Sequence, residues 1–492
     1  MTAKADVEAA SPRVRVLNDR PERPRGAYVL YWMIAARRAS WSFALDAAVS
    51  AARRLDRPLL VLEALRSEYP WASDRLHAYV LSGMVDNARA FAKHGVTYHA
   101  YVEPEHGAGK GLLAALAAKA CLVVTDDYPA FFLPHMLARA ASALDVRLVA
   151  VDGNGLMPMR ALESAPPTAY AFRRTLQRAL PAQLAVRPRA QPLGGALLRD
   201  ASLPRGVLRR WPRASEALLA ARPEALAALP IDHGVPKVRE RGGSVAARKR
   251  LRAFVREGLA RYGEARNDPD ADAGSGLSGW LHFGHVSVHE VFWTLADHEG
   301  WDLTRLGSET RGRRAGFWGM SEAAESFLDE VVTWRELGYV WASLRPDYDA
   351  YASLPDWAQR TLDKHAKDPR DPRYDRATLE AAETHDALWN AAQRQLVREG
   401  RIHNYLRMLW GKKVLEWTRS PREALTVLTE LNNRWAVDGR DPNSYTGILW
   451  VLGRHDRPWA PERKVFGTVR YMSSDNTRRK LDVTAYLKRF GP

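Results

Sequence analysis

The chain has 492 residues, of which 46% are hydrophobic and 26% charged, values typical of a globular protein with an ample core. The single cysteine, Cys121, excludes an intramolecular disulfide and any metal site built from several cysteines, and we expect no metal site. The N-terminus lacks a signal-peptide pattern and no apolar run reaches the roughly 18 residues of a membrane helix. We therefore expect a cytoplasmic protein without a membrane segment.

The charge balance and the tryptophan content restrict the class of partner. Lys and Arg number 73 and Asp and Glu 57, which gives a net charge of +16. Such an excess favours a polyanionic partner, although a general compositional preference for arginine would produce much of it. The 17 tryptophans favour a ligand with flat rings, although core packing would also use them.

The first part of the chain predicts an α/β domain. Residues 1–26 are rich in Arg, Pro and Ala without periodicity and are interpreted as a flexible leader. Over 27–155, apolar runs alternate with helix-like segments, which predicts a parallel, Rossmann-like sheet with helices on both faces. The expected strands are 27–33, 58–65, 96–102, 120–127 and 146–153. Ser40 is expected to cap the first helix and Gly95 to end the second.

The rest of the chain predicts a linker and an all-α domain. Residues 156–240 are rich in Pro, Arg and Ala and are interpreted as an inter-domain linker with short helices. Helical periodicity dominates from 241 to 488, in stretches such as 244–265, 281–292 and 321–341.

A glycine pattern tests the dinucleotide-binding interpretation. Gly274, Gly276 and Gly279 have the spacing of a dinucleotide fingerprint, but they follow a polar turn instead of a strand, so the Rossmann interpretation fails. A loop that cradles a phosphate at a helix N-terminus and a plain interhelical loop both remain open. No phosphate loop occurs elsewhere in the chain.

Three tryptophans, Trp389, Trp410 and Trp417, lie in two helix-like runs joined by a short turn. Trp410 and Trp417 are seven residues apart and share a helix face that also carries His403 and Arg407. Space-filling core tryptophans beside a paired arginine would explain this face, and so would a ligand site. The pattern gives no role to His403.

Other polar groups are spaced in ways that suit a site. Glu330 and Trp334 are four residues apart on one predicted helix and therefore face the same way. A binding site would explain this pair, and so would an ordinary half-buried helix with an acidic residue at the edge of its buried face. The segment 431–445 is dense in Asn and Asp, which would fix a polar heterocycle or satisfy a complicated turn. Basic and aromatic residues alternate over 454–480, a pattern compatible with a phosphate backbone.

Together these motifs resemble the class II cyclobutane pyrimidine dimer DNA photolyases, within the photolyase/cryptochrome family. The resemblance covers roughly residues 240–486 in one order, and the N-terminal half matches more loosely. The matching segments are ARNDPDADAGSGLSGWLHFGHVS, ESFLDEVVTWREL, ETHDALWNAAQ, HNYLRMLWGKKVLEWT, LNNRWAVDGRDPNSYTGILW and VFGTVRYMSSDNTRRKLDV. The resemblance implies an N-terminal α/β domain followed by an all-α FAD-binding domain. It also implies a monomeric deoxyribodipyrimidine photo-lyase that acts on UV-damaged DNA.

The resemblance also implies the residues that bind and reduce FAD. The cofactor-binding residues would be Tyr262, Gly274, Ser275, Gly276, Leu277, Ser278, Arg407, Asn432 and Asp438. Asn432 would face flavin N5, and an Arg407–Asp438 pair would lie close to the ring. Electrons would pass inward from the outermost Trp417 to Trp389 and then to Trp410, which would lie nearest the flavin.

The implied reaction is light-driven repair: excited reduced FAD donates an electron to a flipped-out dimer, the cyclobutane ring splits, and the electron returns. Glu330 would hydrogen-bond the dimer and stabilise its radical anion. The residues implied to bind the lesion are Arg266, Asn267, Glu330, Trp334, Met408 and Trp450.

Several features depart from the family pattern or leave alternatives. The stretch WMIAARRAS differs from the usual sequence of the α/β domain. The resemblance therefore leaves three alternatives open for the antenna pigment: 8-hydroxydeazaflavin, folate or no pigment. A cryptochrome-like flavin photoreceptor without repair activity is the main alternative, and a basic DNA-binding protein without cofactor is another. The presence of Glu330, Trp334 and Trp450 favours repair, because a photoreceptor is expected to lose the residues that contact the dimer.

Overall fold

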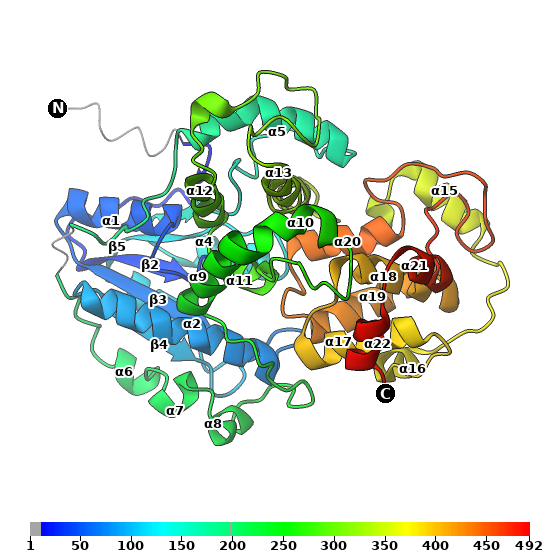
Figure 1. The fold of residues 1–492 in the computed structure, drawn as a ribbon. Helices are drawn as coiled ribbons and strands as arrows, with labels where there is room; N and C mark the ends of the chain where they lie inside the picture. The colour runs from blue at the N-terminus through cyan, green and yellow to red at the C-terminus, as the bar shows by residue number, and fades with distance from the viewer. Residues whose placement is uncertain (1–10, 196–198) are drawn as a thin grey trace. The chain divides into compact units, whose positions relative to one another are not determined.

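The computed structural model describes residues 11–195 and 199–492 (Figure 1). Contacts divide the chain into two compact units, and neither is continuous in sequence. One unit comprises Met1–Leu162, Ala182–Leu251 and Leu277–Thr294, and the other comprises Glu163–Pro181, Arg252–Gly276 and Leu295–Pro492. This division groups segments by packing, so the functional domain limits given by the sequence stay a prediction.

The first unit is built on one six-stranded sheet of order β1-β6-β5-β2-β3-β4. Its strands are β1 Val14–Val16, β2 Tyr28–Met33, β3 Leu59–Leu65, β4 Thr97–Val102, β5 Ala120–Asp126 and β6 Leu148–Val151. The five predicted strands, β2 to β6, are all present and run parallel to one another. The α/β part of the predicted fold class is therefore confirmed.

Strand β1 corrects the prediction for the N-terminus. It pairs antiparallel with β6, with Val14 opposite Val151 and Val16 opposite Val149. The interpretation of 1–26 as a flexible leader is therefore wrong for this stretch, and the sheet is not wholly parallel. Residues 1–10 of the predicted leader lie outside the described residues.

Both faces of the sheet are buried, which explains why its strands read as continuous apolar runs. In β2 alternate residues enter two separate cores, Tyr31 in one and Leu30 in the other. Helices α1 Phe43–Leu55 and α2 Asp74–Lys93 contribute to the first core, and α3 Leu112–Ala117 and α4 Leu133–Ala143 to the second.

The strand order places a topological switch point between β2 and β5, where doubly wound sheets bind ligands. Here the carboxylate of Asp126, at the end of β5, accepts the backbone N–H groups of Ile34, Ala35 and Ala36 at 2.9, 2.8 and 3.0 Å. The Tyr31 hydroxyl donates to the same carboxylate at 2.8 Å. The chain's own carboxylate thus satisfies the N–H groups that follow β2.

The ends of the first two helices test the capping predictions. The N-cap of α1 is Ser42, whose hydroxyl accepts the Leu45 N–H at 3.2 Å, so the prediction of Ser40 is wrong by two residues. Gly95 follows α2 with φ +63°, and its left-handed backbone ends the helix as predicted.

Between 156 and 240 the chain forms α5 Ala169–Leu184, α6 Val207–Arg210, α7 Glu216–Leu219 and α8 Pro223–Ala227. The last three are short, as predicted for this segment, whereas α5 has 16 residues. Beyond it the described chain is helical, which confirms the second part of the fold class. The helices are α9 Ser244–Ala253, α10 Leu259–Ala265, α11 Ser278–His282, α12 Val288–His298, α13 Glu322–Leu328, α14 Arg335–Leu344, α15 Asp356–Lys364, α16 Arg376–Ala381, α17 Ala387–Glu399, α18 Asn404–Trp417, α19 Pro421–Trp435, α20 Pro442–Val451, α21 Ser474–Lys480 and α22 Thr484–Phe490.

Three predicted helices are interrupted. The stretch 281–292 falls on two helices, α11 and α12, because Gly284 takes φ +68° between them. The other two contain π-helical segments, η1 Phe254–Gly258 between α9 and α10, and η3 Asp329–Trp334 between α13 and α14. Single π-helical turns inside α-helices are rare and often lie at functional sites.

Residues 11–195 and 199–492 contain neither a candidate membrane-spanning helix nor a candidate metal-binding cluster. No helix of this part of the chain is both long enough and apolar enough to span a bilayer. In the same residues no group of three or more His, Cys, Asp or Glu side chains is arranged to hold a metal ion. Cys121 is a buried free thiol.

Candidate functional site

The π-helix η3 presents two of the predicted site residues together. Glu330 and Trp334 are its two half-buried residues, and the other four are buried. They therefore share the accessible side of the segment, as their spacing predicted, although the helix is of the π type. Asp329 holds the buried side in place through a two-point ion pair with Arg173, at 2.8 and 3.1 Å.

An ion pair joins η3 to the turn after α10. The Arg266 guanidinium donates to the Glu330 carboxylate and lies 5.7 Å from the centroid of the Tyr262 ring. Burial, with the nearby Glu330 carboxylate, raises the pKa of the Tyr262 phenol to about 12, so this phenol stays neutral. Tyr262, Arg266 and Glu330, predicted for different roles, thus lie together. Asn267, the next residue in the turn, is exposed.

Arg407 on α18 and Asp438 after α19 form the ion pair that the sequence predicted. The guanidinium contacts both carboxylate oxygens, at 2.9 and 3.3 Å. Both side chains are largely buried, and a two-point geometry of this kind orients both groups. The pair is therefore a fixed charged element of this unit.

The Asn432 side chain is buried in an amide network. Its Nδ2 donates to Asn433 Oδ1 at 3.1 Å and to Ser444 Oγ at 2.7 Å. Asn433 in turn donates to the Tyr445 hydroxyl at 3.1 Å and accepts the Arg440 N–H at 2.9 Å. Since both Nδ2 hydrogens of Asn432 are engaged, its carbonyl oxygen is the atom that the side chain offers to a ligand.

The glycine/serine segment lies between α10 and α11 without regular structure up to Leu277. A Cβ placed on Gly274 would meet no atom within 4 Å, so the space beside this residue is open. Gly276 has φ +68°, a left-handed conformation that glycine adopts without strain. Leu277 is buried, and Ser278 begins α11.

The three predicted electron carriers form one row of touching rings, which we call the tryptophan row. The rings of Trp410 and Trp389 are parallel with centroids 6.4 Å apart, and Trp389 meets Trp417 edge-on at 5.5 Å. Both inner indole N–H groups are satisfied, that of Trp389 by the Trp410 carbonyl and that of Trp410 by Gln393 Oε1, each at 3.0 Å. The order along the row is the predicted one.

The outer end of the tryptophan row does not reach the surface. Trp417 is only 2% exposed, although it was predicted to be outermost. Tyr374 and His385 cover its ring, and the sequence analysis overlooked both. They precede Trp417 by more than 30 residues, and no periodicity connects them to it.

Trp450 on α20 has a different environment, which includes a lysine that the sequence analysis also overlooked. The fully buried Lys412 places its ammonium 4.8 Å from the Trp450 centroid and donates to the Val451 carbonyl at 2.6 Å. Burial lowers the pKa of Lys412 to about 7. Arg470, paired with Asp456 at 3.0 Å, lies 5.4 Å from the same indole ring.

His403, at the start of α18, is 7% exposed, and neither ring nitrogen makes a hydrogen bond of good geometry among the described residues, although the Arg266 backbone lies close to the ring. Buried polar atoms normally have well-formed hydrogen bonds, so this side chain is suited to meet a further polar group. Burial lowers its pKa, which favours the neutral imidazole. Met408, on the same helix, is half-buried.

The basic residues of 454–480 differ in exposure, and Arg470, described above, is half-buried. Arg454 is 1% exposed and donates to the Tyr348 carbonyl at 2.6 Å, so it belongs to the interior and is no candidate for phosphate contact. The residues that remain exposed are Arg457, Arg463, Lys464, Arg478, Arg479 and Lys480.

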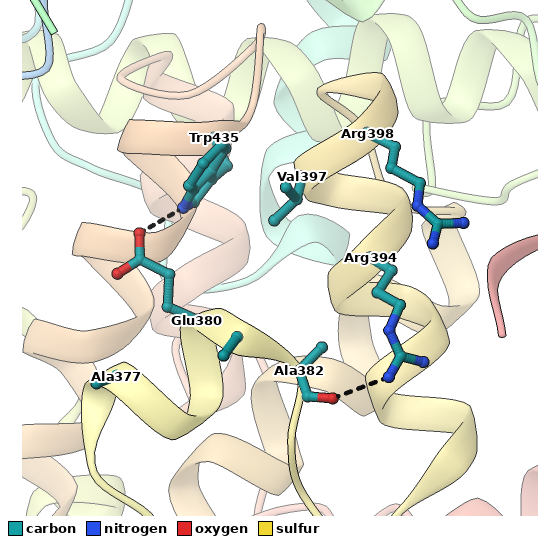
Figure 2. A pocket seen from close by; sticks show the side chains of 8 residues that line it. Ala377, Glu380, Ala382, Arg394, Val397, Arg398 and Trp435 are labelled. Atoms are coloured by element: carbon teal, nitrogen blue, oxygen red, sulfur yellow. Dashed lines mark hydrogen bonds between the residues drawn. The ribbon is translucent and has the colours of Figure 1, made fainter. Parts of the chain in front are cut away.

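A surface pocket between α16, α17 and the end of α19 contains none of the predicted site residues (Figure 2). In it Trp435 Nε1 donates to Glu380 Oε1 at 2.7 Å, and Arg394 donates to the Ala382 carbonyl at 3.2 Å. Its lining residues are Ala377, Glu380, Ala381, Ala382, Arg394, Val397, Arg398 and Trp435. Its polar groups already have partners within the chain, and it is distinct from the site described above.

Sequence comparison finds relatives along nearly the whole chain. The chain is 34% identical over 479 residues to a deoxyribodipyrimidine photo-lyase of Methanothermobacter thermautotrophicus, with 97% of each protein covered. It is 33% identical over 494 residues to one of Oryza sativa, with 96% of this chain and 89% of the relative covered. Over 268 residues it is 41% identical to one of Potorous tridactylus, with 54% and 47% covered. No family model matches the chain.

Solved structures agree in fold. A bacterial class III photolyase from Agrobacterium tumefaciens aligns with a TM-score of 0.67 at 19% identity, covering 94% of this chain and 86% of that one. The cryptochrome of Synechocystis sp. PCC6803 aligns with a TM-score of 0.69 at 15% identity, covering 94% and 88%. At these identities the likeness concerns the fold alone, a mainly parallel α/β part and a helical part.

Proposed function

The chain belongs to the deoxyribodipyrimidine photo-lyase family, and we propose that it is a class II enzyme that repairs cyclobutane pyrimidine dimers in DNA with light. The observation that carries this proposal is the Arg266–Glu330 ion pair beside Tyr262. It joins a carboxylate expected to contact the lesion to a phenol expected to contact the cofactor. The net charge of +16 and the exposed arginines of the C-terminal segment favour DNA as the partner.

FAD is the cofactor that the family implies, and the residues present fit it. The space beside Gly274 is open and offers room for such a group. The buried ring of His403, whose nitrogens make no hydrogen bond of good geometry, offers it a polar contact. Tyr262, the segment from Gly274 to Ser278, and the Arg407–Asp438 pair would hold it. When bound and reduced, FAD supplies on illumination the electron that opens the cyclobutane ring.

Asn432 is suited to orient a ring N–H group. Its Nδ2 is committed to Asn433 and Ser444, so the carbonyl oxygen faces any remaining partner as an acceptor. A carbonyl acceptor favours a protonated ring nitrogen over an unprotonated one. We therefore assign to Asn432 the selection of a flavin that carries hydrogen at N5.

The lesion would be read by residues around the accessible side of η3. A dimer inside a duplex has to be extruded, and its weakened stacking lowers the cost of extrusion. Trp334 and Trp450 would provide apolar walls and Met408 a further contact. Glu330 would hydrogen-bond the dimer once Arg266 turns from the carboxylate toward the DNA, where Arg266 and Asn267 would fill the gap left in the duplex.

A second function compatible with the same fold, which the Synechocystis cryptochrome shares, is a cryptochrome-like photoreceptor. An antenna pigment, 8-hydroxydeazaflavin or folate, stays a prediction for either function. The two functions differ in whether illumination removes dimers, and one assay separates them.

The test uses the purified full chain loaded with FAD and reduced chemically, with an oligonucleotide that contains one thymine dimer. We expect blue or near-UV light to restore the two thymines, and the same sample in the dark to leave the dimer intact. A (6-4) lesion in the same sequence context is the matched substrate control. Unchanged dimer content after illumination would overturn the repair proposal and leave the photoreceptor.

A further inference from the structure

The outer end of the tryptophan row is closed by two residues that connect it to solvent. The Trp417 ring meets the Tyr374 ring at 5.4 Å and the His385 ring at 5.3 Å, both in edge-on geometry. Trp417 is 2% exposed, whereas Tyr374 is half-buried and His385 is exposed. The row of rings therefore continues beyond Trp417 and reaches the surface at these two side chains.

Hydrogen bonds hold the two residues in a fixed arrangement. The Tyr374 hydroxyl lies 2.7 Å from His385 Nδ1, and the His385 backbone N–H donates to the phenol oxygen at 3.0 Å. The Tyr374 N–H donates to the Trp417 carbonyl at 3.1 Å, which fixes the phenol to the helix that carries the indole. With the His385 proton on Nε2, the hydroxyl donates to Nδ1.

This arrangement suits a one-electron oxidation that moves a proton at the same time. A phenol that loses an electron becomes strongly acidic, so its oxidation is favourable only where a base takes the proton. Imidazole is the side chain suited to this transfer near neutral pH. The N–H donated to the phenol oxygen remains after the proton has left and stabilises the oxygen-centred product.

The charges near Trp417 do not oppose the oxidation of its ring, which has to precede electron transfer from Tyr374. Lys413 places its ammonium 5.5 Å from the Trp417 centroid, and the Glu416 carboxylate pairs with it at 2.9 Å. The paired carboxylate offsets the field of the ammonium at the ring. Trp417 is thus free of an unbalanced cation.

We propose that Tyr374 is the terminal electron donor of the tryptophan row and that His385 accepts its proton. One electron passes from Tyr374 to the oxidised indole of Trp417, and the phenolic proton passes to His385 Nδ1. The products are neutral Trp417, a neutral tyrosyl radical and an imidazolium. The oxidant at the other end is the photoexcited flavin, and an external thiol returns one electron to Tyr374 while His385 returns the proton.

This inference rests on the proposed function, because it takes the tryptophan row as the route of flavin photoreduction. The consequence is that the oxidised site becomes accessible to a reductant in solution, which a fully enclosed Trp417 is not. Transfer of the proton to His385 also makes return of the electron from the flavin slower, since the proton must return with it.

The test follows radicals by electron paramagnetic resonance and transient absorption in the FAD-loaded full chain after a flash, without added reductant. We expect a tyrosyl radical in the parent, formed more slowly in D2O than in H2O. Tyr374→Phe should abolish the tyrosyl signal and leave a shorter-lived tryptophan radical. Tyr471→Phe, which removes an exposed phenol outside the row, is the control and should change neither signal.

Variants of His385 separate a base from mere packing. His385→Phe keeps a ring against Trp417 but has no proton acceptor, so it should suppress the tyrosyl signal. His385→Asn keeps a weak acceptor and should restore part of it. In the dark protein without flavin, nuclear magnetic resonance should find His385 protonated at Nε2, with an Nδ1 signal that shifts in Tyr374→Phe.

The outcomes distinguish this inference from the proposed function. Suppose that Trp389→Phe slows photoreduction, so that the tryptophan row is the route. The inference alone is then overturned if Tyr374→Phe keeps a tyrosyl radical, and equally if His385→Phe forms the radical as fast as the parent. If Trp389→Phe leaves photoreduction unchanged, the tryptophan row is not the route and the inference falls with it, whereas the repair function is decided separately by the dimer assay with chemically reduced protein. A dark-state proton on Nδ1 would also contradict the assigned donor.

Discussion

The helical unit contains two tryptophan environments, and their difference is electrostatic. Trp389 and Trp410 are packed against other indoles, with their N–H groups bonded to an uncharged amide or carbonyl. Trp450 instead lies within 4.8 Å of the Lys412 ammonium, whereas the Arg470 guanidinium at 5.4 Å is paired with Asp456. Cations stabilise the neutral indole and oppose its oxidation. In the proposed function one residue type is thus used for electron passage in the first environment and for contact with the lesion in the second.

The largest expected effect lies on the lesion side. Glu330→Gln keeps the size of the side chain but removes the charge, and we expect the rate of repair to fall roughly a hundredfold, as when one stabilising group of a transition state is lost. Flavin photoreduction should be unchanged, because Glu330 is not part of the tryptophan row. Single-turnover repair under saturating DNA measures this, and equal loss of both activities would show that the two environments are not separate.

The reciprocal change lies in the tryptophan row. Trp410→Phe should slow flavin photoreduction roughly tenfold or more, which corresponds to ~1.4 kcal/mol or more of barrier. Repair by chemically reduced enzyme should stay near the parent rate. Absorbance changes of the bound flavin under illumination measure the first quantity, and Trp334→Phe, outside the row, is a matched control. Parent-like photoreduction in Trp410→Phe would mean that the electron uses another route.

Trp450→Ala should weaken binding of the lesion by about 1–3 kcal/mol, the usual contribution of an aromatic ring stacked on a base. Titration of dimer-containing and undamaged oligonucleotides measures it, and binding to undamaged DNA should change less. Photoreduction should be as fast as in the parent. A loss of photoreduction would instead place Trp450 among the electron carriers, against the electrostatic argument.

The last prediction concerns Lys412 and, unlike the others, is a pH dependence of stability and not a change in photoreduction, repair or DNA binding. The unfolded lysine has its ordinary pKa near 10.5 and the folded one about 7, so between these values the unfolded chain binds a proton that the folded chain does not. Stability therefore rises with pH across this window, by at most ~1.4 kcal/mol per pH unit, and the gain is lost as pH falls to about 7. Lys412→Met should remove this component.

Urea unfolding from pH 7 to pH 10 measures the slope. Lys413→Met, on the next residue, controls for the loss of a lysine at this point of α18. If the slope in Lys412→Met equals that of the parent, Lys412 is not the group responsible and its ammonium does not govern the environment of Trp450.

Local sequence was sufficient where a pattern recurs over short distances. The strands were predictable because a sheet covered on both faces needs continuous apolar runs. The two helices of the tryptophan row and the turn at Gly400 were predictable from spacing, and the Arg407–Asp438 pair from the family resemblance. Strand β1 was not predictable from the sequence, because its three residues are too few to show a pattern and their pairing depends on β6.

The chain by itself determined the fold class, the family and the identity of most candidate site residues, since these depend on patterns and motifs that are local in sequence. Tertiary structure alone decided which of them meet. It closed Trp417 from solvent, brought Tyr374 and His385 onto its ring, paired Arg266 with Glu330, and buried Lys412 beside Trp450. The physical reason is that burial, ring contact and charge balance depend on segments far apart along the chain, and no spacing within one segment encodes them.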